Sequence, residues 1–507
     1  MQAKPTRERV LALNSWHDNW RGLNVAVLGL GVTGFSVADT VAELGARVRV
    51  IAAAPDPDRE KLLRVIGAEF VALPEDSDQL AELQSFDPDL VVVSPGYRPE
   101  HPLTTWAQQN QIPVWGDIEL AWRLRDKTGR VAEWICVTGT NGKTTTSQLL
   151  AHMLVAGGHK AAPVGNIGTP ILDAIRDPEG FDVLVVELSS FQLARLGYIE
   201  PWASACLNIA DDHLDWHGGL SAYLGAKAKV FENTKVACLY NRADDATLRM
   251  VEDADVIEGA RAVSFGLDIP PVAGTGVVEN ILADRTFNDD RRSAALELVT
   301  LDELRQRDIA QPHMVQNILA AAALARSYGV SPEAIAAAVL AFRPDAHRVE
   351  TVAVVDNITW IDDSKATNAH AAHAALMASE SVVWILGGLL KGVDLTDLIR
   401  SHRHRLKGAV VIGVERDSIV RVLSQEAPDA PVVEIKAETD TEAGAISREE
   451  LGQRVMNDAV KAAQKLAESG DTVLLSPAAA SMDQYVSYAD RGEKFQTAVR
   501  EELGLNQ

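Results

Sequence analysis

The sequence is poor in cysteine, in long apolar runs and in positive charge. Its 507 residues include three cysteines, Cys136, Cys206 and Cys238, which lie far apart and inside apolar runs. This spacing excludes a disulfide framework and the usual zinc motifs, and it predicts buried thiols in a reducing compartment. No stretch approaches about 18 uninterrupted apolar residues, and the N-terminus lacks a signal-peptide core, so we expect a soluble, cytoplasmic protein.

The charge balance makes nucleic acid an unexpected partner. Lys and Arg number 48 against 71 Asp and Glu, which gives a formal net charge of −23. A surface with this charge repels a phosphate backbone at long range. If the substrates are anionic, a few placed cationic side chains, helix N-termini or bound cations must meet their charge locally.

Chain length and apolar runs predict a three-domain α/β protein. At roughly 100 to 200 residues per domain, the chain holds about three domains. Eight short β-branched runs without polar alternation are typical of strands buried on both faces of parallel sheets. These runs are residues 24–29, 47–52, 89–94, 134–139, 182–187, 381–388, 408–413 and 471–476.

Two polar stretches, residues 123–133 and 342–348, mark the expected domain boundaries. They separate a Rossmann-like domain, a central ATPase-type domain with a parallel sheet, and a second Rossmann-like domain. The predicted ranges of these domains are 1–125, 126–344 and 345–507.

Other segments are predicted by composition alone. Residues 313–329 are rich in alanine and predict a helix that a glycine ends, and Ser331 followed by a proline begins another helix. Two polar stretches near 268–310 and 436–456 lack strong periodicity, and we interpret them as surface insertions.

A nucleotide-binding loop is predicted where the run 134–139 meets a helical stretch. Residues 139–144 read Gly-Thr-Asn-Gly-Lys-Thr. A strand, a glycine turn and a helix start direct backbone N–H groups at one point, where Lys143 can reach the β- and γ-phosphates and the Thr144 hydroxyl can bind Mg²⁺. Val137 stands where the general pattern has its first glycine, and a chance Gly-Lys-Thr at a turn is the alternative.

A second polar group follows the next strands. Glu187 ends the run 182–187, at the sheet edge where ligands bind in parallel α/β folds, and is a candidate Mg²⁺ ligand. Residues 208–218 are dense in aspartate and histidine and include His213. Taken singly, each of these side chains can be a satisfied loop contact. As a set beside a nucleotide loop, they indicate a functional site.

These motifs resemble those of the Mur ligases. The loop at 139–144 is the variant that this family shares with folylpolyglutamate synthetase. Glu-Leu-Ser-Ser-Phe-Gln-Leu at 187–193 and the segment 208–218 are most similar to the branch that adds D-glutamate to UDP-N-acetylmuramoyl-L-alanine. The resemblance implies that ATP phosphorylates the L-alanine carboxylate and that the D-glutamate amine attacks the acyl phosphate. It also implies a monomer that serves peptidoglycan synthesis, and through it cell shape and cell division.

The metal site implied by the resemblance includes a modified lysine. Thr144, Glu187 and His213 would hold two Mg²⁺ ions. Residues 223–227 match the family's Tyr-x-x-Ala-Lys, whose lysine carries a CO₂-derived carbamate. Carboxylation of Lys227 would replace a cation by an anionic oxygen ligand, provided that its amine is first neutral. From the residues alone, Lys227 can equally be a solvated helix lysine.

The resemblance assigns ATP to the loop and to two later segments. His313 and Asn317 lie one helical turn apart and match a family segment near adenine, although Met314 replaces an asparagine there and a packing role is the alternative. The implied ATP-binding residues are Gly139, Thr140, Asn141, Gly142, Lys143, Thr144, Thr145, His313, Asn317 and Asp363. The implied catalytic residues are Lys143, His213, Lys227, Arg348 and Lys365.

The predicted third domain carries the amino-acid end of the resemblance. His347-Arg348 resembles the family's arginine that moves onto the γ-phosphate when the domain closes; a surface arginine is the alternative. Residues 363–368 read Asp-Ser-Lys-Ala-Thr-Asn, a family motif in which Lys365 stabilises the transferring phosphoryl group. The implied D-glutamate-binding residues are Thr367, Lys391, Ser481 and Tyr488.

A glycine loop in the predicted first domain has two interpretations. Residues 29–34, Gly-Leu-Gly-Val-Thr-Gly, follow a strand as in an NAD site, but Ala52 to Ala54 stand where the ribose-binding acidic residue belongs. In the Mur ligases this loop binds the UDP diphosphate, and many relatives carry an aspartate for uracil where these alanines stand. The implied UDP-substrate residues are Gly31, Val32, Thr33, Ser94 and Asn166.

Three other functions compete with this interpretation. They are a sibling ligase or folylpolyglutamate synthetase, a nicotinamide-dependent oxidoreductase built on the loop 29–34, and a nucleotide switch without catalysis. Amino-acid-dependent turnover of ATP separates the ligases from the last two, and the identity of the amino acid separates the ligases from one another.

Overall fold

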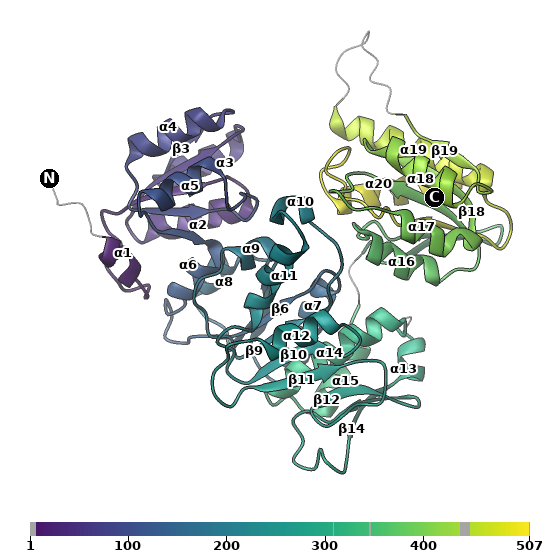
Figure 1. Ribbon diagram of the computed structural model, residues 1–507, viewed down its shortest axis with the longest axis horizontal. Helices are drawn as coiled ribbons and strands as arrows, with labels where there is room; N and C mark the ends of the chain where they lie inside the picture. Colours follow the sequence, from purple (N-terminus) through teal and green to yellow (C-terminus); the bar gives the residue numbers. More distant parts are fainter. Residues whose placement is uncertain (1–6, 308, 344–345, 437–446, 506–507) are drawn as a thin grey trace, which may run out of the picture. The chain divides into compact units, whose positions relative to one another are not determined.

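The computed structural model describes residues 7–307, 309–343, 346–436 and 447–505. Its strands form three sheets (Figure 1). The chain divides into two compact units: Met1–Ile209 with Leu220–Phe342, and Ala210–Gly219 with Arg343–Gln507. The first unit contains two of the sheets and the second unit contains one, so the predicted three-domain α/β class is confirmed.

The first sheet is fully parallel, in the order β3-β2-β1-β4-β5. Its strands are β1 (Asn24–Leu28), β2 (Arg47–Ala52), β3 (Glu69–Ala72), β4 (Leu90–Val93) and β5 (Val114–Gly116). Its helices, after α1 (Arg7–Ala12), are α2 (Val32–Glu43), α3 (Pro57–Val65), α4 (Asp76–Phe86), α5 (Pro102–Gln109) and α6 (Asp117–Arg123). The order reverses between β1 and β4, and ligands of open α/β sheets bind at such a point.

The central sheet has nine strands in the order β14-β13-β12-β11-β10-β9-β6-β8-β7. Its strands are β6 (Glu133–Thr138), β7 (Ala161–Gly165), β8 (Val183–Glu187), β9 (Ala203–Cys206), β10 (Ala237–Asn241), β11 (Arg261–Phe265), β12 (Gly274–Val278), β13 (Ile281–Asp284) and β14 (Leu296–Thr300). Its helices are α7 (Lys143–Ala156), α8 (Ile171–Ile175), α9 (Ser190–Ala194), α11 (Leu220–Ala228), η1 (Lys229–Phe231), α12 (Asp245–Glu252), α13 (Leu301–Arg305), α14 (Pro312–Ser327) and α15 (Pro332–Ala341). Because β6 pairs with β8 on one side and with β9 on the other, the loop after it opens from an inner strand of the sheet.

The sheet of the second unit runs β15-β16-β20-β17-β18-β19, and only β15 is antiparallel to its neighbour. Its strands are β15 (Glu350–Val355), β16 (Ile358–Asp362), β17 (Val382–Gly387), β18 (Leu406–Ile412), β19 (Val432–Glu434) and β20 (Thr472–Leu475). The helices of this unit are α10 (Leu214–His217), α16 (Ala369–Met377), α17 (Thr396–His402), η2 (Arg403–Arg405), α18 (Arg416–Glu426), α19 (Arg448–Leu466) and α20 (Tyr488–Glu502).

All eight predicted apolar runs form parallel strands, and the two helices predicted around 313–341 are α14 and α15. The reason is visible in β1, where Val25 and Val27 join one core cluster while Ala26 and Leu28 join another on the opposite face. A strand with two buried faces has no position for a polar side chain. The three cysteines are also buried and unpaired, as predicted.

The interpretation of residues 268–310 as a surface insertion is wrong. They contain β12, β13 and β14, which extend the central sheet by an antiparallel meander. Leu282 lies in the core, and the fully buried Asp284 pairs with Arg326 at 2.9 Å. These strands are four or five residues long, so their periodicity is too brief to detect.

The second predicted insertion, 436–456, is also largely wrong where it can be compared with the structure. Residues 437–446 lie outside the described residues. Ser447 then caps α19 through a capping box with Glu450, and Val455 and Met456 are buried against the sheet. α19 is an amphipathic helix, but the many charged residues in its first turns make its apolar periodicity hard to recognise in the sequence.

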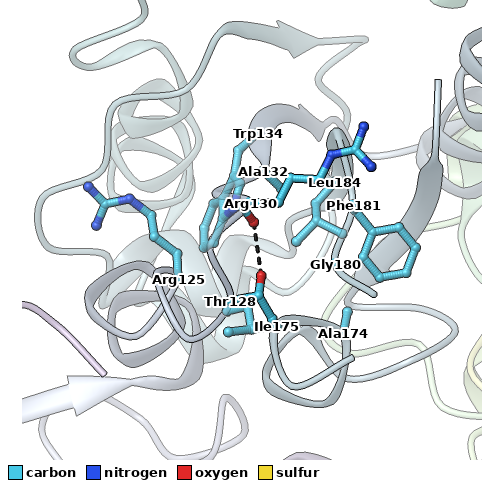
Figure 2. A pocket seen from close by; sticks show the side chains of 10 residues that line it. All are labelled: Arg125, Thr128, Arg130, Ala132, Trp134, Ala174, Ile175, Gly180, Phe181 and Leu184. Carbon is cyan, nitrogen blue, oxygen red and sulfur yellow. Dashed lines mark hydrogen bonds between the residues drawn. The ribbon is translucent and has the colours of Figure 1, made fainter. Parts of the chain in front are cut away.

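The two sheets of the first unit share one hydrophobic core. Val25 and Val27 of β1 belong to the same cluster as Trp134 and Cys136 of β6. A small cavity of about 10 Å³ beside β6 and β8 is lined by Trp134 and nine other residues (Figure 2). This volume holds roughly one water molecule, so the cavity is not a substrate site.

No helix among the described residues is long and apolar enough to cross a membrane.

A buried carboxyl group of the first unit makes stability depend on pH. Asp117 begins α6, is 4% exposed, and accepts a hydrogen bond of 2.9 Å from Nε2 of Gln192 on α9. Burial raises the pKa of Asp117 from 3.8 to about 6. Because the folded state holds this proton more tightly, the associated stability is present below about pH 4 and is lost as the pH rises through about 6.

We predict that Asp117→Asn, which cannot ionise, removes this loss. Between pH 4 and pH 7, the free energy of unfolding of the variant should rise relative to that of the wild type by roughly 3 kcal/mol. The difference between their thermal midpoints, which measures this change, should rise with it. Asp58→Asn, at a side chain that is 94% exposed, is the control. Its thermal midpoint should differ from that of the wild type by the same amount at every pH. A midpoint difference for Asp117→Asn that does not change with pH would contradict the prediction.

Candidate active site

The loop after β6 is held by backbone geometry that requires glycine and by contacts from two other segments. Gly139 and Gly142 have φ of +149° and +84°, values that side chains disfavour. Asn208 fixes Asn141 between them, because its Oδ1 accepts from the Asn141 N–H at 2.9 Å and its Nδ2 donates to the Asn141 carbonyl at 3.1 Å. The Thr140 hydroxyl lies 2.7 Å from the hydroxyl of Tyr223. The loop is therefore preformed.

Two lysine side chains converge on this loop. Lys143 Nζ donates to the carbonyls of Gly139 and Thr140, both at 2.8 Å. Lys227 Nζ donates to the same Gly139 carbonyl at 2.8 Å and lies 3.4 Å from the Thr138 hydroxyl. Lys227 is only 2% exposed, so the alternative of a solvated helix lysine is wrong. Both side-chain nitrogens thus lie at the loop that the sequence predicts to bind phosphate.

Glu187 has the environment expected of a cation ligand. Its side chain is 1% exposed, and one carboxylate oxygen accepts from Asn166 Nδ2 at 2.8 Å. The other oxygen, Oε2, is buried and has no hydrogen-bond partner among the described residues. A buried carboxylate oxygen without a donor is costly unless a cation or a water satisfies it, and Mg²⁺ prefers such oxygens. Asn166 is thus placed beside Glu187.

The start of α14 contacts the phosphate loop through Asn317. A Cβ placed on Gly142 would lie 2.4 Å from Asn317 Oδ1, so only glycine allows this approach. His313, one turn earlier, is exposed. Met314 is buried in the core with Val315, which favours the packing role at this position.

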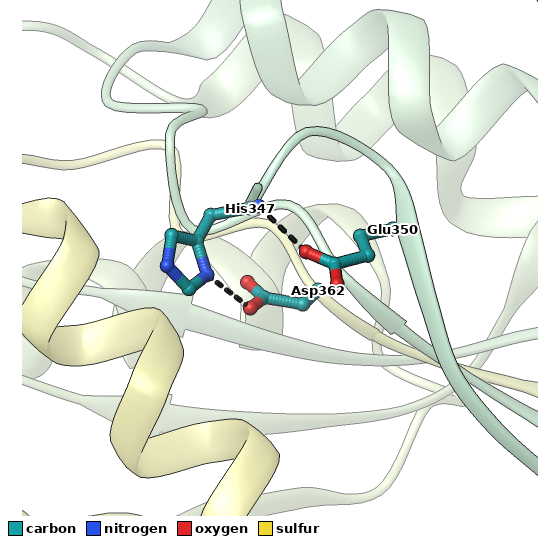
Figure 3. A group of neighbouring side chains, drawn as sticks. All are labelled: His347, Glu350 and Asp362. Atoms are coloured by element: carbon teal, nitrogen blue, oxygen red, sulfur yellow. Dashed lines mark hydrogen bonds and ion pairs between the residues drawn. The ribbon is translucent and has the colours of Figure 1, made fainter. Parts of the chain in front are cut away.

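In the second unit, His347 and Asp362 form a buried pair (Figure 3). His347 Nδ1 lies 2.6 Å from Asp362 Oδ2, and this hydrogen bond raises the pKa of His347. Glu350 accepts from the His347 N–H at 2.9 Å, and Gln496 Nε2 donates to both carboxylates. Because an amide donor already lies between the carboxylates, we interpret the group as a hydrogen-bond network and not as a metal site.

The segment 363–368 follows this network directly. Asp363 is buried, accepts from the Ser476 hydroxyl at 2.8 Å, and has its pKa raised by burial to about 7 despite the opposing charge of Arg348. The side chain of Lys365 lies over the ring of Tyr488, with Nζ 4.8 Å from the ring centroid. The structure thus brings together four predicted site residues in two pairs, Arg348 with Asp363 and Lys365 with Tyr488.

The loops that carry Lys391 and Ser481 lie side by side. Leu389 and Ala480 exchange backbone hydrogen bonds of 2.9 Å in both directions. Lys391 Nζ lies 3.4 Å from His213 Nε2 and 3.5 Å from an oxygen of Asp212. Within the second unit, His213 is therefore a neighbour of a predicted D-glutamate ligand.

Sequence reasoning missed one buried arginine of this unit. Arg491 on α20 is 0% exposed and donates to the hydroxyl and carbonyl of Ser364 and to the Ala479 carbonyl. It ties the segment 363–368 to the loop before Ser481. Nothing in the sequence distinguishes it from the surface arginines of a charged helix.

The glycine loop of the first sheet is tightly packed against Ser94. Cβ atoms placed on Gly29 and Gly34 would lie 2.8 and 3.2 Å from the Ser94 hydroxyl, which has no hydrogen-bond partner among the described residues. Val32 is 59% exposed at the start of α2, where backbone N–H groups can meet an anion. Arg59 Nη1 donates to the Leu30 carbonyl at 3.1 Å, so a cation lies beside the loop despite the three alanines.

Comparison with protein families matches three segments of the chain. The Mur ligase MurD-like N-terminal domain matches residues 23–116, the Mur ligase middle domain matches residues 137–325, and the Mur ligase glutamate ligase domain matches residues 347–479.

Curated relatives match along nearly the whole chain. A protein named UDP-N-acetylmuramoylalanine--D-glutamate ligase from Leifsonia xyli subsp. xyli is 58% identical over 98% of this chain and 96% of its own length. Proteins of the same name from Streptomyces coelicolor and Mycobacterium bovis are 47% and 43% identical, over 96% and 94% of this chain and 99% and 96% of their own.

Solved structures support the fold. A pseudomurein peptide ligase type C from Methanothermus fervidus has a TM-score of 0.55 at 16% identity, and UDP-N-acetylmuramate-alanine ligase MurC from Thermotoga maritima has a TM-score of 0.54 at 19% identity. Each covers 95% of this chain and 100% of the solved chain. Since three family domains match in order and a relative is 58% identical over 98% of the chain, the chain belongs to the Mur ligase family.

Proposed function

We propose that the chain uses ATP to join D-glutamate to UDP-N-acetylmuramoyl-L-alanine. The observation that carries this proposal is the convergence of Lys143 and Lys227 on the Gly139 carbonyl, in a preformed loop of the type that cradles phosphates. The relatives that bear the name of this activity reach 58% identity. The reaction belongs to peptidoglycan precursor synthesis, and we place it in the cytoplasm, with the protein acting as a monomer.

The chemistry proceeds through an acyl phosphate. The L-alanine carboxylate attacks the γ-phosphorus of ATP, and ADP leaves. The neutral amine of D-glutamate then attacks the acyl carbon, the tetrahedral intermediate loses phosphate, and an amide remains. Lys143, Arg348 and Lys365 neutralise charge that develops on the phosphoryl group, which is where electrostatic catalysis acts.

Thr144, Glu187, His213 and a carbamate on Lys227 would hold Mg²⁺, which when bound neutralises phosphate charge and orients the acyl oxygen. The unsatisfied oxygen of Glu187 fits this role. The buried position of Lys227 beside the phosphate loop supports a carbamate ligand at this residue.

The two substrates are assigned to separate loops. Gly31, Val32, Thr33, Ser94 and Asn166 bind the UDP-linked substrate, and Asn166 does so while it orients Glu187. Lys391 and Ser481 bind the carboxylates of D-glutamate, a role suited to a cation and a hydroxyl. Thr367 meets the incoming amino acid, and the ring of Tyr488 closes the pocket over Lys365.

Phosphate release tests the proposed substrate. With UDP-N-acetylmuramoyl-L-alanine, ATP and Mg²⁺ present, D-glutamate should stimulate phosphate release, whereas L-glutamate and meso-diaminopimelate should not. If only another amino acid stimulates phosphate release, the chain has the activity of another branch of the family. ATP-independent retention on immobilised NAD with no phosphate release would favour the oxidoreductase.

We predict that Lys143→Ala lowers kcat by on the order of 10²- to 10³-fold, because the variant loses a cation at the β- and γ-phosphates. Steady-state phosphate release measures the loss. Lys160→Ala, which removes a partly exposed lysine paired with Glu179 in the same domain, is the control and should retain wild-type kcat. Wild-type phosphate release from Lys143→Ala would refute the nucleotide assignment.

We predict that Lys227→Ala loses activity that acetate or propionate partly restores, because a small carboxylate can supply the missing oxygen ligand. Rates measured against carboxylate concentration should rise and saturate. The Lys143→Ala variant should gain nothing from the same carboxylates. Full activity of Lys227→Ala without any addition would show that the buried lysine has no catalytic role.

A further inference from the structure

The segment Ser189–Gly197, which consists of α9 and its two flanks, connects the central sheet to the loops of the first sheet. We call it the α9 segment. The residue before it, Leu188, is bonded to β6, the strand before the phosphate loop: the Leu188 N–H donates to the Val137 carbonyl at 2.9 Å, and the Thr138 hydroxyl donates to the Leu188 carbonyl at 2.7 Å. Glu187 ends β8, two residues before the segment begins.

Gln192 makes the first connection to the other sheet. Its Oε1 accepts from the N–H and the hydroxyl of Ser189, at 3.0 and 3.1 Å, which completes a capping box. Its Nε2 donates to Asp117 Oδ2 at 2.9 Å, and both side chains are buried. Because both ends of the amide are engaged, Gln192 holds α6 at a fixed distance from the start of α9.

Arg195 makes the second connection, at the other end of α9. Its Nη2 donates to the carbonyls of Tyr97 and Arg98, at 2.9 and 2.7 Å. The Tyr97 N–H in turn donates to the Ser94 carbonyl at 3.2 Å, so Arg195 holds the far end of the turn that begins at Ser94. Charge-assisted bonds of this kind are stronger than neutral ones.

The backbone at Gly197 also lies close to a side chain of α6. A Cβ placed on Gly197 would lie 2.4 Å from Oε2 of Glu119, whose other oxygen, Oε1, accepts from Arg123 Nη2 at 2.9 Å. The hydrogen bonds of Gln192 and Arg195 therefore join the segment to the first sheet's helix α6 and Ser94 turn, while those of Leu188 join it to the central sheet.

We infer that Gln192 and Arg195 are positioning residues for the ligase reaction, which hold the Ser94 turn at a fixed position relative to Glu187 and the phosphate loop. The UDP-linked substrate must reach from its diphosphate site to the phosphoryl group. A displacement of the Ser94 turn therefore weakens the binding of this substrate but not that of ATP. The inference rests on the proposed roles of Ser94 and Glu187.

Arg195→Met tests the connection to the Ser94 turn. The KM for UDP-N-acetylmuramoyl-L-alanine should rise about tenfold, the factor that corresponds to one charged hydrogen bond, while the KM for ATP stays within about twofold. Arg405→Met is the matched control: Arg405 is also partly buried, also donates to a backbone carbonyl, that of Ser379, and lies in the other unit. It should leave the KM for the UDP-linked substrate unchanged.

A charge swap tests the connection through Gln192. Gln192→Glu alone sets two carboxylates against each other and should raise the same KM by at least about tenfold at pH 8. The double variant Asp117→Asn/Gln192→Glu restores an amide and a carboxylate in reversed order and should return the KM to within about threefold of wild type. A merely structural defect would lower the thermal midpoint without this selective recovery of one KM.

Ser94→Ala separates failure of the inference from failure of the site assignment. If Ser94→Ala raises the KM for the UDP-linked substrate while Arg195→Met behaves like Arg405→Met, and the double swap shows no recovery, the inference is overturned and the site stands. If Ser94→Ala leaves this KM unchanged, the role of Ser94 is overturned and the inference falls with it.

Discussion

The hydrogen bonds from Lys143 and Lys227 to one carbonyl, that of Gly139, are the contact on which the rest of the structure depends. The chain carries a formal charge of −23 and must nevertheless hold a nucleotide triphosphate. In the proposed function, Lys143 and the backbone N–H groups of the loop meet the phosphates, while Lys227 would carry a carbamate whose oxygen meets Mg²⁺. Net charge thus says little about affinity at a buried site.

The surroundings of this loop follow from the need to keep it preformed. Gly142 packs closely against Asn317, and Asn141 is hydrogen-bonded to Asn208. Glu187 ends the neighbouring strand, and one of its carboxylate oxygens has no hydrogen-bond partner among the described residues. Because β6 is an inner strand whose two faces are buried in different hydrophobic clusters, the loop cannot move without disturbing both clusters. Rigidity of the fold is therefore transmitted to the positions of Lys143 and Lys227.

Much of this could be predicted from the sequence, because the strands are uniformly apolar and the motifs are contiguous. The predictions failed where charged side chains are buried, because a charged residue in the sequence is normally expected at the surface. The strands of 268–310 are short and enclose a buried Asp284, and Arg491 is indistinguishable in sequence from a surface residue. Gln192 and Arg195 lie in or beside a known motif, yet their partners, Asp117 of α6 and Arg98 of a loop, lie 75 and 97 residues earlier in the sequence, a pairing that only the fold discloses.

A crystal structure with Mg²⁺ and a non-hydrolysable ATP analogue tests the central claim most directly. The account predicts that the β- and γ-phosphates occupy the 139–144 loop, that Lys143 leaves the carbonyls of Gly139 and Thr140 to bind them, and that Mg²⁺ lies about 2.1 Å from the Thr144 hydroxyl. A nucleotide bound elsewhere, with Lys143 still bonded to both carbonyls, would contradict it.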